Sequence, residues 1–526
     1  MKIIIPDIKI PIEKDTQDYY KQYLIKKLLI SNNFKFSFKI LKKSLDARNK
    51  KQFFYNITFL IIISNKYKNK KNYQIYTPKK EKIYFIHSKT KKISPIIIGF
   101  GPAGIFAALN FLKYGIKPII FEQGKPIEQR NKDIENFIKN KELNVNSNIQ
   151  FGEGGAGAYS DGKLVTRVKE NDYIDQVLKT FVKFGASKEI LYKNKPHIGT
   201  DIIQKIVYNI RNYILKQGAE IFFNAKMTNL IFSKSKLIGI EINNNEKHYS
   251  STILLAIGHS SRETFEILQK NNIHLEQKAF AIGTRIEHPK EEIQYMQYGN
   301  KYKNDSRLKT AEYMLTFNNK KTNRGVFSFC MCPGGYIINA SSEKECLTIN
   351  GMSYSNRSND FSNSAIVVTI NTRDFNSSNS LAGIELQRFI EKKFFTNSGS
   401  NWTMPGQNLK DFLNSTQSKK LNNNSYQMPL ISKNLIEIFP KYISTELLNA
   451  FKYWSQKIPL FISNKAILIG CETRTSSAVR ITRNKTRESI NTKSLYPIGE
   501  GSGYSGGITS SAIDAIKTVE TILNPN

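Results

Sequence analysis

Hydrophobic and polar residues alternate strictly over residues 34–40 (FKFSFKI), which is typical of a strand with one buried face. Residues 15–31 instead carry apolar side chains at helical spacing, at Tyr20, Leu24 and Leu28. Asp15 or Thr16 stands where a helix is usually capped, so this segment is predicted to be a helix.

Two more strands are predicted at residues 52–63 and 82–88, and the lysine-rich segment between them is interpreted as a solvated hairpin loop. Together these elements predict a small N-terminal α/β domain over residues 1–90. This domain contains no short motif that points to chemistry.

The pattern changes sharply at residue 93. Residues 93–124 contain an apolar strand, a glycine turn, an alanine-rich helix and a second strand. Strand-rich segments follow at 218–232 and 251–265, and the end of the chain returns to strand, glycine loop and helix. From about residue 266 to 465 the pattern of strand-like and helix-like segments is mixed. It includes a helix candidate at 384–395 and a polar stretch at 413–427.

The strongest motif is GFGPAG at residues 99–104. A lone GxGxxG pattern is weak, but here an apolar strand precedes it and a helix follows, as in dinucleotide-binding turns. Gly99 allows the tight turn, Gly101 lets a pyrophosphate approach the backbone, and Gly104 lets helix and strand pack closely. The helix N-terminus would offer N–H groups to the phosphates. Glu122 ends the next strand, where a carboxylate accepts hydrogen bonds from ribose hydroxyls.

A second formal match, Gly152-x-Gly154-x-x-Gly157, follows a polar segment and precedes no apolar helix. We therefore interpret residues 151–164 as an irregular glycine loop and not as a second dinucleotide turn. Its polar residues Ser160, Asp161 and Lys163 would lie close to a ligand; a plain surface loop is the alternative.

Glycine is concentrated again in LYPIGEGSGYSGGITSSAIDA, residues 495–515. Glycine loses the most conformational freedom on ordering, so a cluster before a helix indicates close approach of a ligand to the backbone. We expect this segment to fold back beside the first strand of the glycine-turn unit. A helix from about Ile508 would then point its positive end at the electron-rich ring of a flavin. A site made from both chain ends suits FAD better than NAD, whose site lies mostly in one continuous unit.

AIGHSSRETF (256–265) is typical of a strand-ending turn that touches such a cofactor a second time. His259 lies in this turn, where a lone histidine is more often structural than catalytic. Cys330 and Cys332 form an i, i+2 pair, whose thiols would share one face of a strand with Cα atoms near the ~7 Å limit for an unstrained disulfide. We expect them to lie beside the flavin without exchanging electrons with it.

ETRTSSAVRITR (472–483) contains a cluster of arginine and hydroxyl side chains. Arg474, Ser477 and Arg480 would clamp a carboxylate or phosphate of the substrate, or else belong to a solvated strand.

Composition changes this picture little. The chain has 526 residues with 78 Lys+Arg and 43 Asp+Glu, a formal net charge of +35. The lysines are spread evenly and accompany frequent Ile and Asn, as genome-wide drift would produce, so nucleic acid is not expected as the main partner. Four cysteines form neither a disulfide framework nor a zinc pattern, and no metal is expected. Without a signal peptide or a span of ~20 apolar residues, a cytoplasmic location is expected.

Taken as a set, these segments resemble the uncharacterised FAD-dependent dehydrogenase family of bacteria and plastids, which is distantly similar to glutathione-reductase-type FAD/NAD(P)-binding proteins. The matching segments include IIIGFGPAGIFAAL, NIQFGEGGAGAYSDGKL, LLAIGHSSRETF, FAIGTRIEHP, FSFCMCPGGYI, GCETRTSSAVRITR and LYPIGEGSGYSGGITSSAIDA.

The resemblance implies an α/β fold with a split, Rossmann-like FAD-binding domain over residues 91–265 and 466–526. An α+β substrate-side domain would be inserted at 266–465, and the N-terminal domain at 1–90 would be ferredoxin-like. The residues expected to bind FAD, Arg130 among them through this resemblance, are Gly99, Phe100, Gly101, Pro102, Ala103, Gly104, Glu122, Gln123, Arg130, Gly154, Gly155, Ser160, Asp161, Ala225, Gly258, Gly499, Glu500, Gly507 and Ile508.

We therefore expect an FAD-dependent oxidoreductase with an unidentified small-molecule substrate. NAD(P)H, if it is the electron donor, would have to reach the flavin without a Rossmann domain of its own. The alternatives are a flavin monooxygenase-like enzyme, an RNA-modifying or RNA-binding flavoprotein, and a flavin-holding scaffold without turnover. The sequence does not specify the oligomeric state.

Overall fold

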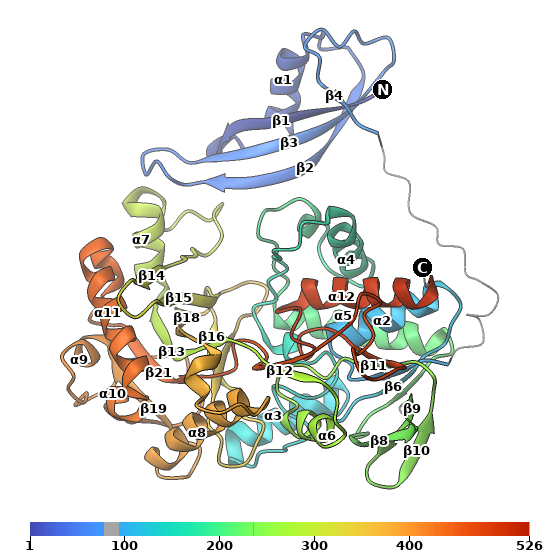
Figure 1. Ribbon diagram of the computed structural model, residues 1–526. Coiled ribbons are helices and arrows are strands. Elements are labelled where there is room, and N and C mark those ends of the chain that lie inside the picture. Colours follow the sequence, from blue (N-terminus) through green and yellow to red (C-terminus); the bar gives the residue numbers. More distant parts are fainter. Residues whose placement is uncertain (78–93, 235, 525–526) are drawn as a thin grey trace.

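A small N-terminal domain stands above a larger body of mixed α/β structure (Figure 1). The computed structural model describes residues 1–77, 94–234 and 236–524. The strand predicted at 82–88 lies outside these residues. Within them, no helix combines the length and the apolar character that crossing a membrane requires.

Antiparallel strands form the N-terminal sheet in the order β2-β3-β1-β4. They are β1 (Lys2–Pro11), β2 (Phe36–Asp46), β3 (Phe54–Ile63) and β4 (Gln74–Ile75). The strands predicted at 34–40 and 52–63 correspond to β2 and β3, but the sequence pattern did not predict β1. Pro6 interrupts the apolar run of β1, and a bulge at Asp7, whose φ is 51°, lets the strand continue past it.

Helix α1 (Gln17–Leu28) packs on this sheet with Tyr20, Leu24 and Leu28 all buried, which confirms the helix prediction. Thr16 is its N-cap, since its side chain accepts a hydrogen bond from the Tyr19 N–H at 3.3 Å. Asp15 does not cap the helix; its carboxylate accepts hydrogen bonds from the side chains of Tyr20 and Lys43.

The first half of the body contains a five-stranded parallel sheet in the order β23-β11-β5-β6-β7. Its strands are β5 (Ile96–Ile98), β6 (Ile119–Phe121), β7 (Glu220–Phe222), β11 (Ile253–Leu255) and β23 (Leu495–Pro497). The C-terminal strand thus returns to the sheet of β5, but not directly beside it as predicted. β11 lies between the two, because its fully buried residues suit the interior of a parallel sheet.

Helices cover this sheet, and α2 (Pro102–Lys113) packs along α12 (Ile508–Leu523) from the other end of the chain (Figure 1). The other helices of this half are α3 (Ile127–Asn140), α4 (Asn171–Lys183), α5 (Thr200–Lys216) and α6 (Arg262–Lys270). A small sheet of β8 (Met227–Ser233), β9 (Lys236–Ile242) and β10 (Glu246–Tyr249) lies at its edge.

The second half contains a seven-stranded sheet in the order β14-β15-β18-β13-β21-β19-β20. Its strands are β13 (Phe280–Pro289), β14 (Thr316–Asn319), β15 (Arg324–Cys332), β18 (Phe361–Ile370), β19 (Met404–Asn408), β20 (Leu430–Ser432) and β21 (Ile467–Glu472). β21 pairs with β13, so the chain leaves this sheet after Glu472 and not at residue 466, where a domain boundary was expected.

Helices α7 (Lys290–Tyr302), α8 (Ala382–Asn397), α9 (Leu409–Leu413), α10 (Leu435–Ile438) and α11 (Lys441–Lys457) surround the seven-stranded sheet. Two ribbons complete the fold, β12 (Leu275–Gln277) with β22 (Val479–Ile481) and β16 (Tyr336–Asn339) with β17 (Ile349–Met352).

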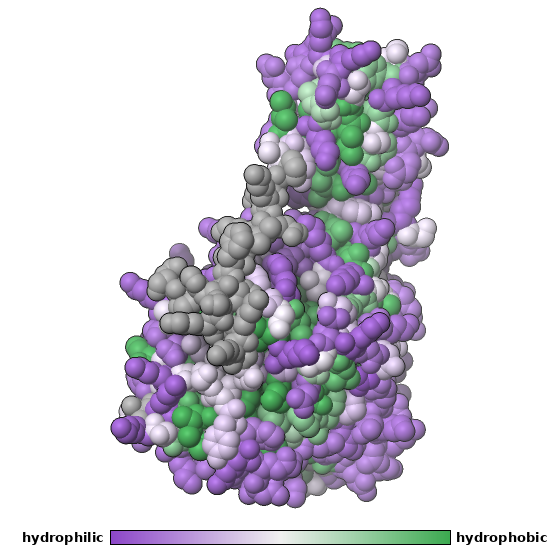
Figure 2. Space-filling view, turned by 90° about the vertical axis from the view of Figure 1, so that its right-hand side faces the viewer, coloured by the Kyte–Doolittle hydropathy of each residue, from purple (hydrophilic) through white to green (hydrophobic). Residues whose placement is uncertain are grey.

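The N-terminal domain is packed onto the body by apolar contacts. Phe53 is fully buried, and its ring stacks on Tyr302 of α7 with the centroids 4.2 Å apart. Ile12 and Phe53 both belong to the main hydrophobic cluster of the body. Figure 2 shows this domain as a lobe above the body, with hydrophilic residues over most of the visible face.

Candidate functional site

Residues of both large sheets line a cavity of about 380 Å³, a volume within the usual range of small-molecule sites. The predicted cofactor-binding residues that line it are Gly99, Gly101, Pro102, Ala103, Glu122, Gln123, Gly155, Ser160, Asp161, Ala225, Gly258, Glu500, Gly507 and Ile508. Five other predicted residues lie behind this lining: Phe100, Gly104, Arg130, Gly154 and Gly499.

The glycine turn between β5 and α2 forms one wall. Gly99 has a φ of 99°, and a Cβ there would lie 2.5 Å from the carbonyl oxygen of Ala256. A Cβ on Gly104 would lie 1.9 Å from the Gly99 carbonyl oxygen, so this glycine allows α2 to pack on β5. Gly101 differs, because the nearest atom to its Cβ position is the Cα of Gly155 at 3.6 Å. Gly101 therefore lines the cavity without a close contact that forbids a side chain.

Glu122 joins this turn to the glycine loop. Its Oε2 accepts a hydrogen bond from the Phe100 N–H at 2.8 Å, and its Oε1 accepts from Gly124 and Gly152, each at 2.9 Å. A carboxylate has about four lone-pair positions, so Oε2 retains capacity for a ribose hydroxyl.

Arg130 supports the loop from behind. Its guanidinium is fully buried and donates to the carbonyl oxygens of Asn148, Ile149, Glu153 and Gly155 at 2.7–3.0 Å. It does not line the cavity, and its contacts position the glycine loop; its place near the adenosine, which the resemblance implied, stays a prediction.

The other predicted residues behind the lining also have packing roles. Gly154 donates its N–H to the carbonyl oxygen of Phe100 at 2.8 Å, which fixes the loop on the glycine turn. Gly499 has a φ of 72°, and a Cβ there would lie 2.6 Å from the Cβ of Ala103. These residues shape the cavity without facing it.

Two helices from opposite ends of the chain begin at the cavity. Gly101 precedes α2 and Gly507 precedes α12, and neither N-cap residue offers a side-chain hydrogen bond. The unpaired N–H groups of a first helical turn and its partial positive charge favour a bound anion. A Cβ on Gly258 or Gly506 would meet no atom within 4 Å, so both leave room in the cavity.

His259 also faces the cavity, with Nδ1 3.4 Å from Glu500 Oε1. Its Nε2 is buried and has no hydrogen-bond partner among the described residues. A buried polar atom without a partner needs an explanation, and a ligand in this cavity would supply one. The open glycine turn, the two free helix ends and this histidine together fit FAD.

Asp161 forms a charged part of the wall between Lys163 and Arg357. It accepts hydrogen bonds from Lys163 Nζ at 2.8 Å and from Arg357 Nη2 at 2.6 Å. Burial opposes ionisation of Asp161, but the two cations outweigh this and hold its pKa at about 2. Ser160, Asp161 and Lys163 all line the cavity, so the glycine loop does bring these polar groups to it.

Cys330 lines the end of the cavity that the seven-stranded sheet forms, whereas Cys332 lies fully buried behind it. Strand β15 bulges between Phe329 and Cys332, and Cys330 has a φ of 43°, so the regular-strand geometry assumed from the sequence does not hold here. Both thiols are free. The neighbouring Cys332 thiol, together with Arg285 and Lys163, lowers the pKa of Cys330 to about 6 in spite of its burial.

Glu472 is a second titratable group at this end, and the sequence did not single it out. Arg285 donates its Nε–H to Glu472 Oε2 at 3.2 Å, and both residues are buried. Burial raises the pKa of Glu472 to about 7 although Arg285 opposes the rise. The available signals were an acid at the end of the apolar run ILIGCE and an arginine inside the apolar FAIGTRIEHP.

The anion clamp predicted from Arg474, Ser477 and Arg480 does not assemble. The Arg474 guanidinium donates to Glu391 at 2.8 and 2.9 Å, and the Ser477 hydroxyl donates to the Val479 carbonyl oxygen at 2.7 Å. Arg480 is half-exposed. Of the three, only Arg474 lines the cavity.

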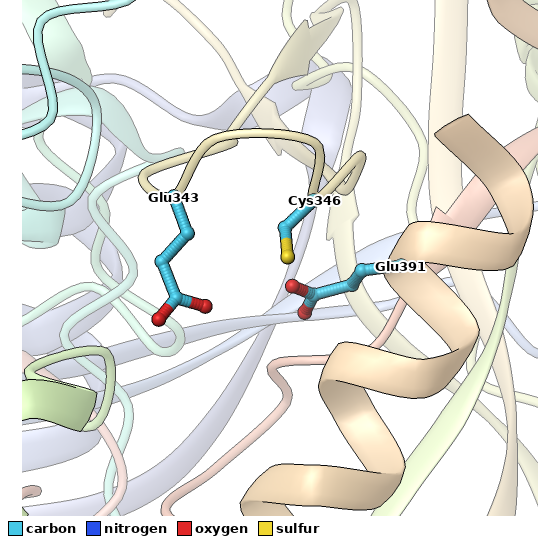
Figure 3. Close-up of side chains that lie close together, drawn as sticks. All are labelled: Glu343, Cys346 and Glu391. Carbon is cyan, nitrogen blue, oxygen red and sulfur yellow. The ribbon is translucent and has the colours of Figure 1, made fainter. Parts of the chain in front are cut away.

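Glu343, Cys346 and Glu391 lie close together (Figure 3), and their ligand atoms are within 4.8 Å of one another. Their carboxylates are already paired, because Arg262 reaches Glu343 at 2.5 Å and Glu391 at 2.8 Å. Burial, with Glu391 and Glu343 nearby, raises the pKa of the Cys346 thiol to about 12. This group is therefore an ionic network that joins α6 to α8, and we assign no metal to it.

Comparison with known proteins agrees with a flavin site. Residues 279–475 match the family described as "FAD-dependent protein, C-terminal domain-like", and residues 1–61 match a domain of unknown function. An uncharacterised protein from Clostridium beijerinckii is 42% identical over 532 residues, which cover 99% of each chain.

Solved structures resemble the chain only distantly. The flavin-dependent brominase Bmp2 is 12% identical with a TM-score of 0.36, over 82% of this chain and 78% of that one. The glycerol-3-phosphate dehydrogenase from Bacillus halodurans, solved with FAD, is 10% identical with a TM-score of 0.36, over 82% and 64%.

The family match and the near full-length relative identify the group to which the protein belongs. The geometry of the cavity fits the cofactor that this family is named for. The chain is a member of the family of uncharacterised FAD-dependent proteins, and its cofactor is FAD.

Proposed function

We propose that this protein is an FAD-dependent oxidoreductase whose small-molecule substrate meets the cofactor at the Cys330–Glu472 end of the cavity. One observation supports this above all. The same cavity has a glycine turn and two free helix N-termini on one side and two titratable groups with pKa values near neutrality on the other. Perturbed pKa values in a cavity are typical of sites that transfer protons.

The residues that would hold FAD follow from their positions. Glu122 would accept a hydrogen bond from a ribose hydroxyl, and the first turns of α2 and α12 would bind the pyrophosphate and the electron-rich edge of the ring. His259 Nε2 would find its missing partner on the cofactor. When bound, FAD would supply the electron-pair transfer of the reaction.

Cys330 and Glu472 would handle the proton that accompanies electron transfer. Burial raises the pKa of Glu472 towards neutrality, so this carboxyl would hold or release a proton near neutral pH. The neighbouring Cys332 thiol, with Arg285 and Lys163, lowers the pKa of Cys330, which favours its thiolate form. Arg285 lies against both groups, since its Nη2 donates to the Cys330 carbonyl oxygen at 2.7 Å and its Nε to Glu472.

The cofactor and the reaction are tested separately. Chromatography of the flavin released by heat should give FAD, and FMN or no flavin would contradict the cofactor assignment. The protein is then photoreduced without oxygen and mixed with quinones, disulfides, NAD(P)⁺ or O₂, while the return of visible flavin absorbance is followed.

The acceptor that restores the absorbance fastest defines the reaction. Rapid reoxidation by one organic acceptor supports an oxidoreductase of that class. Preference for O₂ would favour the monooxygenase-like alternative. Absence of reoxidation by every acceptor would leave a flavin-holding scaffold and refute the proposed function.

A further inference from the structure

A second, larger cavity of about 790 Å³ lies between the N-terminal domain and the body. Residues of β2 and β3 form one wall, and residues 189–195, 297–312 and Arg357 contribute to the other. We call this cavity the interdomain cleft. It is separate from the cofactor cavity and shares no lining residue with it.

Hydrogen bonds between backbones hold the two walls together. The Lys43 N–H donates to the Tyr192 carbonyl oxygen at 2.8 Å, and the Asn194 N–H donates back to the Lys43 carbonyl oxygen at 2.8 Å. The edge of β2 is thus paired with the body, and Phe53 packs on Tyr302 nearby. The cleft is therefore a built feature of the fold with ordered walls.

Cations dominate the lining of the cleft. Among the described residues that line it, eight side chains are Lys or Arg and four are Asp or Glu. Asp161 and Asp305 pair with Arg357 and Arg307 from outside the lining, and even with these two acids the cations exceed the acids by two. Such a surplus in a concave site attracts anions.

Lys309 is an exposed cation in the lining of the cleft, where a bound anion would reach it. Across the described residues 1–77, 94–234 and 236–524, no hydrogen bond or ion pair is made by its ammonium group. Partial loss of solvent, together with the charges of Lys193 and Arg357, lowers its pKa, and Glu189 and Glu312 offset this only in part. Lys50 is similar, because its ammonium group donates to the uncharged carbonyl oxygen of Gln297.

The back of the cleft reaches the cofactor cavity. Arg357 lines the cleft, and its guanidinium pairs with Asp161, which lines the cofactor cavity. One ion pair thus connects the linings of the two spaces. A ligand in the cleft would lie next to the wall of the flavin site.

We propose that the interdomain cleft binds a phosphate-bearing anion of nucleotide size. Phosphate groups carry the multiple negative charges that this surplus of lysines and arginines matches, and Lys and Arg are the side chains that bind them best. The volume is at the upper part of the range for small-molecule sites, and the charged lining is unsuited to an apolar ligand. This inference does not depend on the proposed reaction.

The test is calorimetric titration of the FAD-loaded, full-length protein with inorganic pyrophosphate, with ADP and with citrate. Citrate carries similar charge without phosphate. Lys309→Gln removes the unpaired cation, and Lys247→Gln removes an equally exposed lysine on β10, away from the cleft. Visible absorbance checks that FAD stays bound, so loss of the cofactor is distinguished from loss of the anion site.

We expect saturable binding of pyrophosphate or ADP at one site, weakened about tenfold by Lys309→Gln and unchanged by Lys247→Gln. Tighter binding of ADP than of pyrophosphate would assign the site to nucleotides. Equal binding of ADP and pyrophosphate would assign it to the phosphate group alone. Three results would overturn the proposal: no saturable binding, equal binding of citrate, or binding that Lys309→Gln leaves unchanged.

Discussion

Arg357 and Asp161 are paired across 196 positions of sequence, with Arg357 Nε and Nη2 3.0 and 2.6 Å from the two carboxylate oxygens of Asp161. Both side chains are buried. The pair joins the glycine loop of the five-stranded half to the loop before β18 in the seven-stranded half. The same pair lies between the cofactor cavity, which Asp161 lines, and the interdomain cleft, which Arg357 lines.

Asp161→Asn should destabilise the protein, because it leaves the half-buried Lys163 without its carboxylate and Arg357 with Glu312 alone. We expect the free energy of unfolding at pH 7 to fall by about 3 kcal/mol. The folded pKa of Asp161 is about 2, below the ordinary value of 3.8, so its contribution is present above the ordinary pKa and is lost as the pH falls towards 2.

Urea unfolding at pH 7 and at successively lower pH checks this prediction. The difference between wild type and Asp161→Asn should shrink as the pH falls towards 2. Glu385→Gln is the control, since its side chain is 60% exposed in its pair with Arg388 and should matter little. A difference that does not change with pH would contradict the argument.

Gly101→Ala should weaken FAD binding, whereas Gly104→Ala should lower the stability of the fold. A Cβ on Gly101 has its nearest neighbour at 3.6 Å, so the variant should fold normally but weaken FAD binding at least about tenfold by filling the approach to the pyrophosphate. A Cβ on Gly104 would collide with the Gly99 carbonyl oxygen, so this variant should unfold at a lower temperature even without FAD.

Fluorescence titration with FAD and thermal unfolding of the apoprotein separate the two effects. Normal FAD affinity in a folded Gly101→Ala variant would show that the phosphates do not approach this glycine.

Gly507→Asp should change stability and cofactor affinity in opposite directions. Asp is a better N-cap than a residue without a side-chain acceptor, so α12 should gain a few tenths of a kcal/mol or more. The same carboxylate would face the cavity at the end of the helix that is proposed to bind FAD, and would repel its phosphates.

Gly507→Asn is the matched control, because Asn caps equally well without the charge. We expect similar melting temperatures for the two apoproteins, with FAD bound less tightly by Gly507→Asp than by Gly507→Asn. Equal FAD affinity would mean that α12 does not interact with the anionic part of the cofactor.

Cys330 should be the thiol that alkylates at mildly acidic pH. Its pKa of about 6 makes it a thiolate above that pH, whereas burial raises the pKa of Cys346 to about 12. In the apoprotein, iodoacetamide labelling followed by mass spectrometry should give a rate at Cys330 that falls as the pH drops below about 6.

Two further measurements test whether Cys330 lies beside bound FAD and whether Cys332 lowers its pKa. Bound FAD should protect it, and Cys332→Ala should raise its titration midpoint, because the Cys332 thiol is the largest cause of the low pKa.

Cys332→Ser should keep FAD and alter the rate of flavin reduction by less than about tenfold. Interconversion of a dithiol and a disulfide in step with flavin reduction would instead make the protein a dithiol oxidoreductase.

The local elements could be predicted from the sequence because their signals are local. The spacing of Tyr20, Leu24 and Leu28 was sufficient to place α1, and the strand, glycines and alanine-rich helix around residues 99–104 were sufficient to place the turn between β5 and α2. The start of α12 at Ile508 follows from the glycine run before it. Each of these is decided by side chains within a few residues of one another.

Contacts between distant segments could not be predicted in this way. Arg130 and Arg474 have the side chains of ligand-binding residues, yet the first holds the glycine loop and the second pairs with Glu391. The sequence shows that a guanidinium is present, but not which carbonyl or carboxylate the fold brings against it.

The sequence by itself determined the cofactor-binding turn, the helices that begin at it and the family. Only the tertiary structure decided that β11 lies between β5 and β23, that Glu472 and Arg285 meet at the end of the cavity, and that Lys309 lines the interdomain cleft. The physical reason is that backbone conformation depends on near neighbours, whereas burial, ion pairing and pKa depend on which distant residues packing brings together.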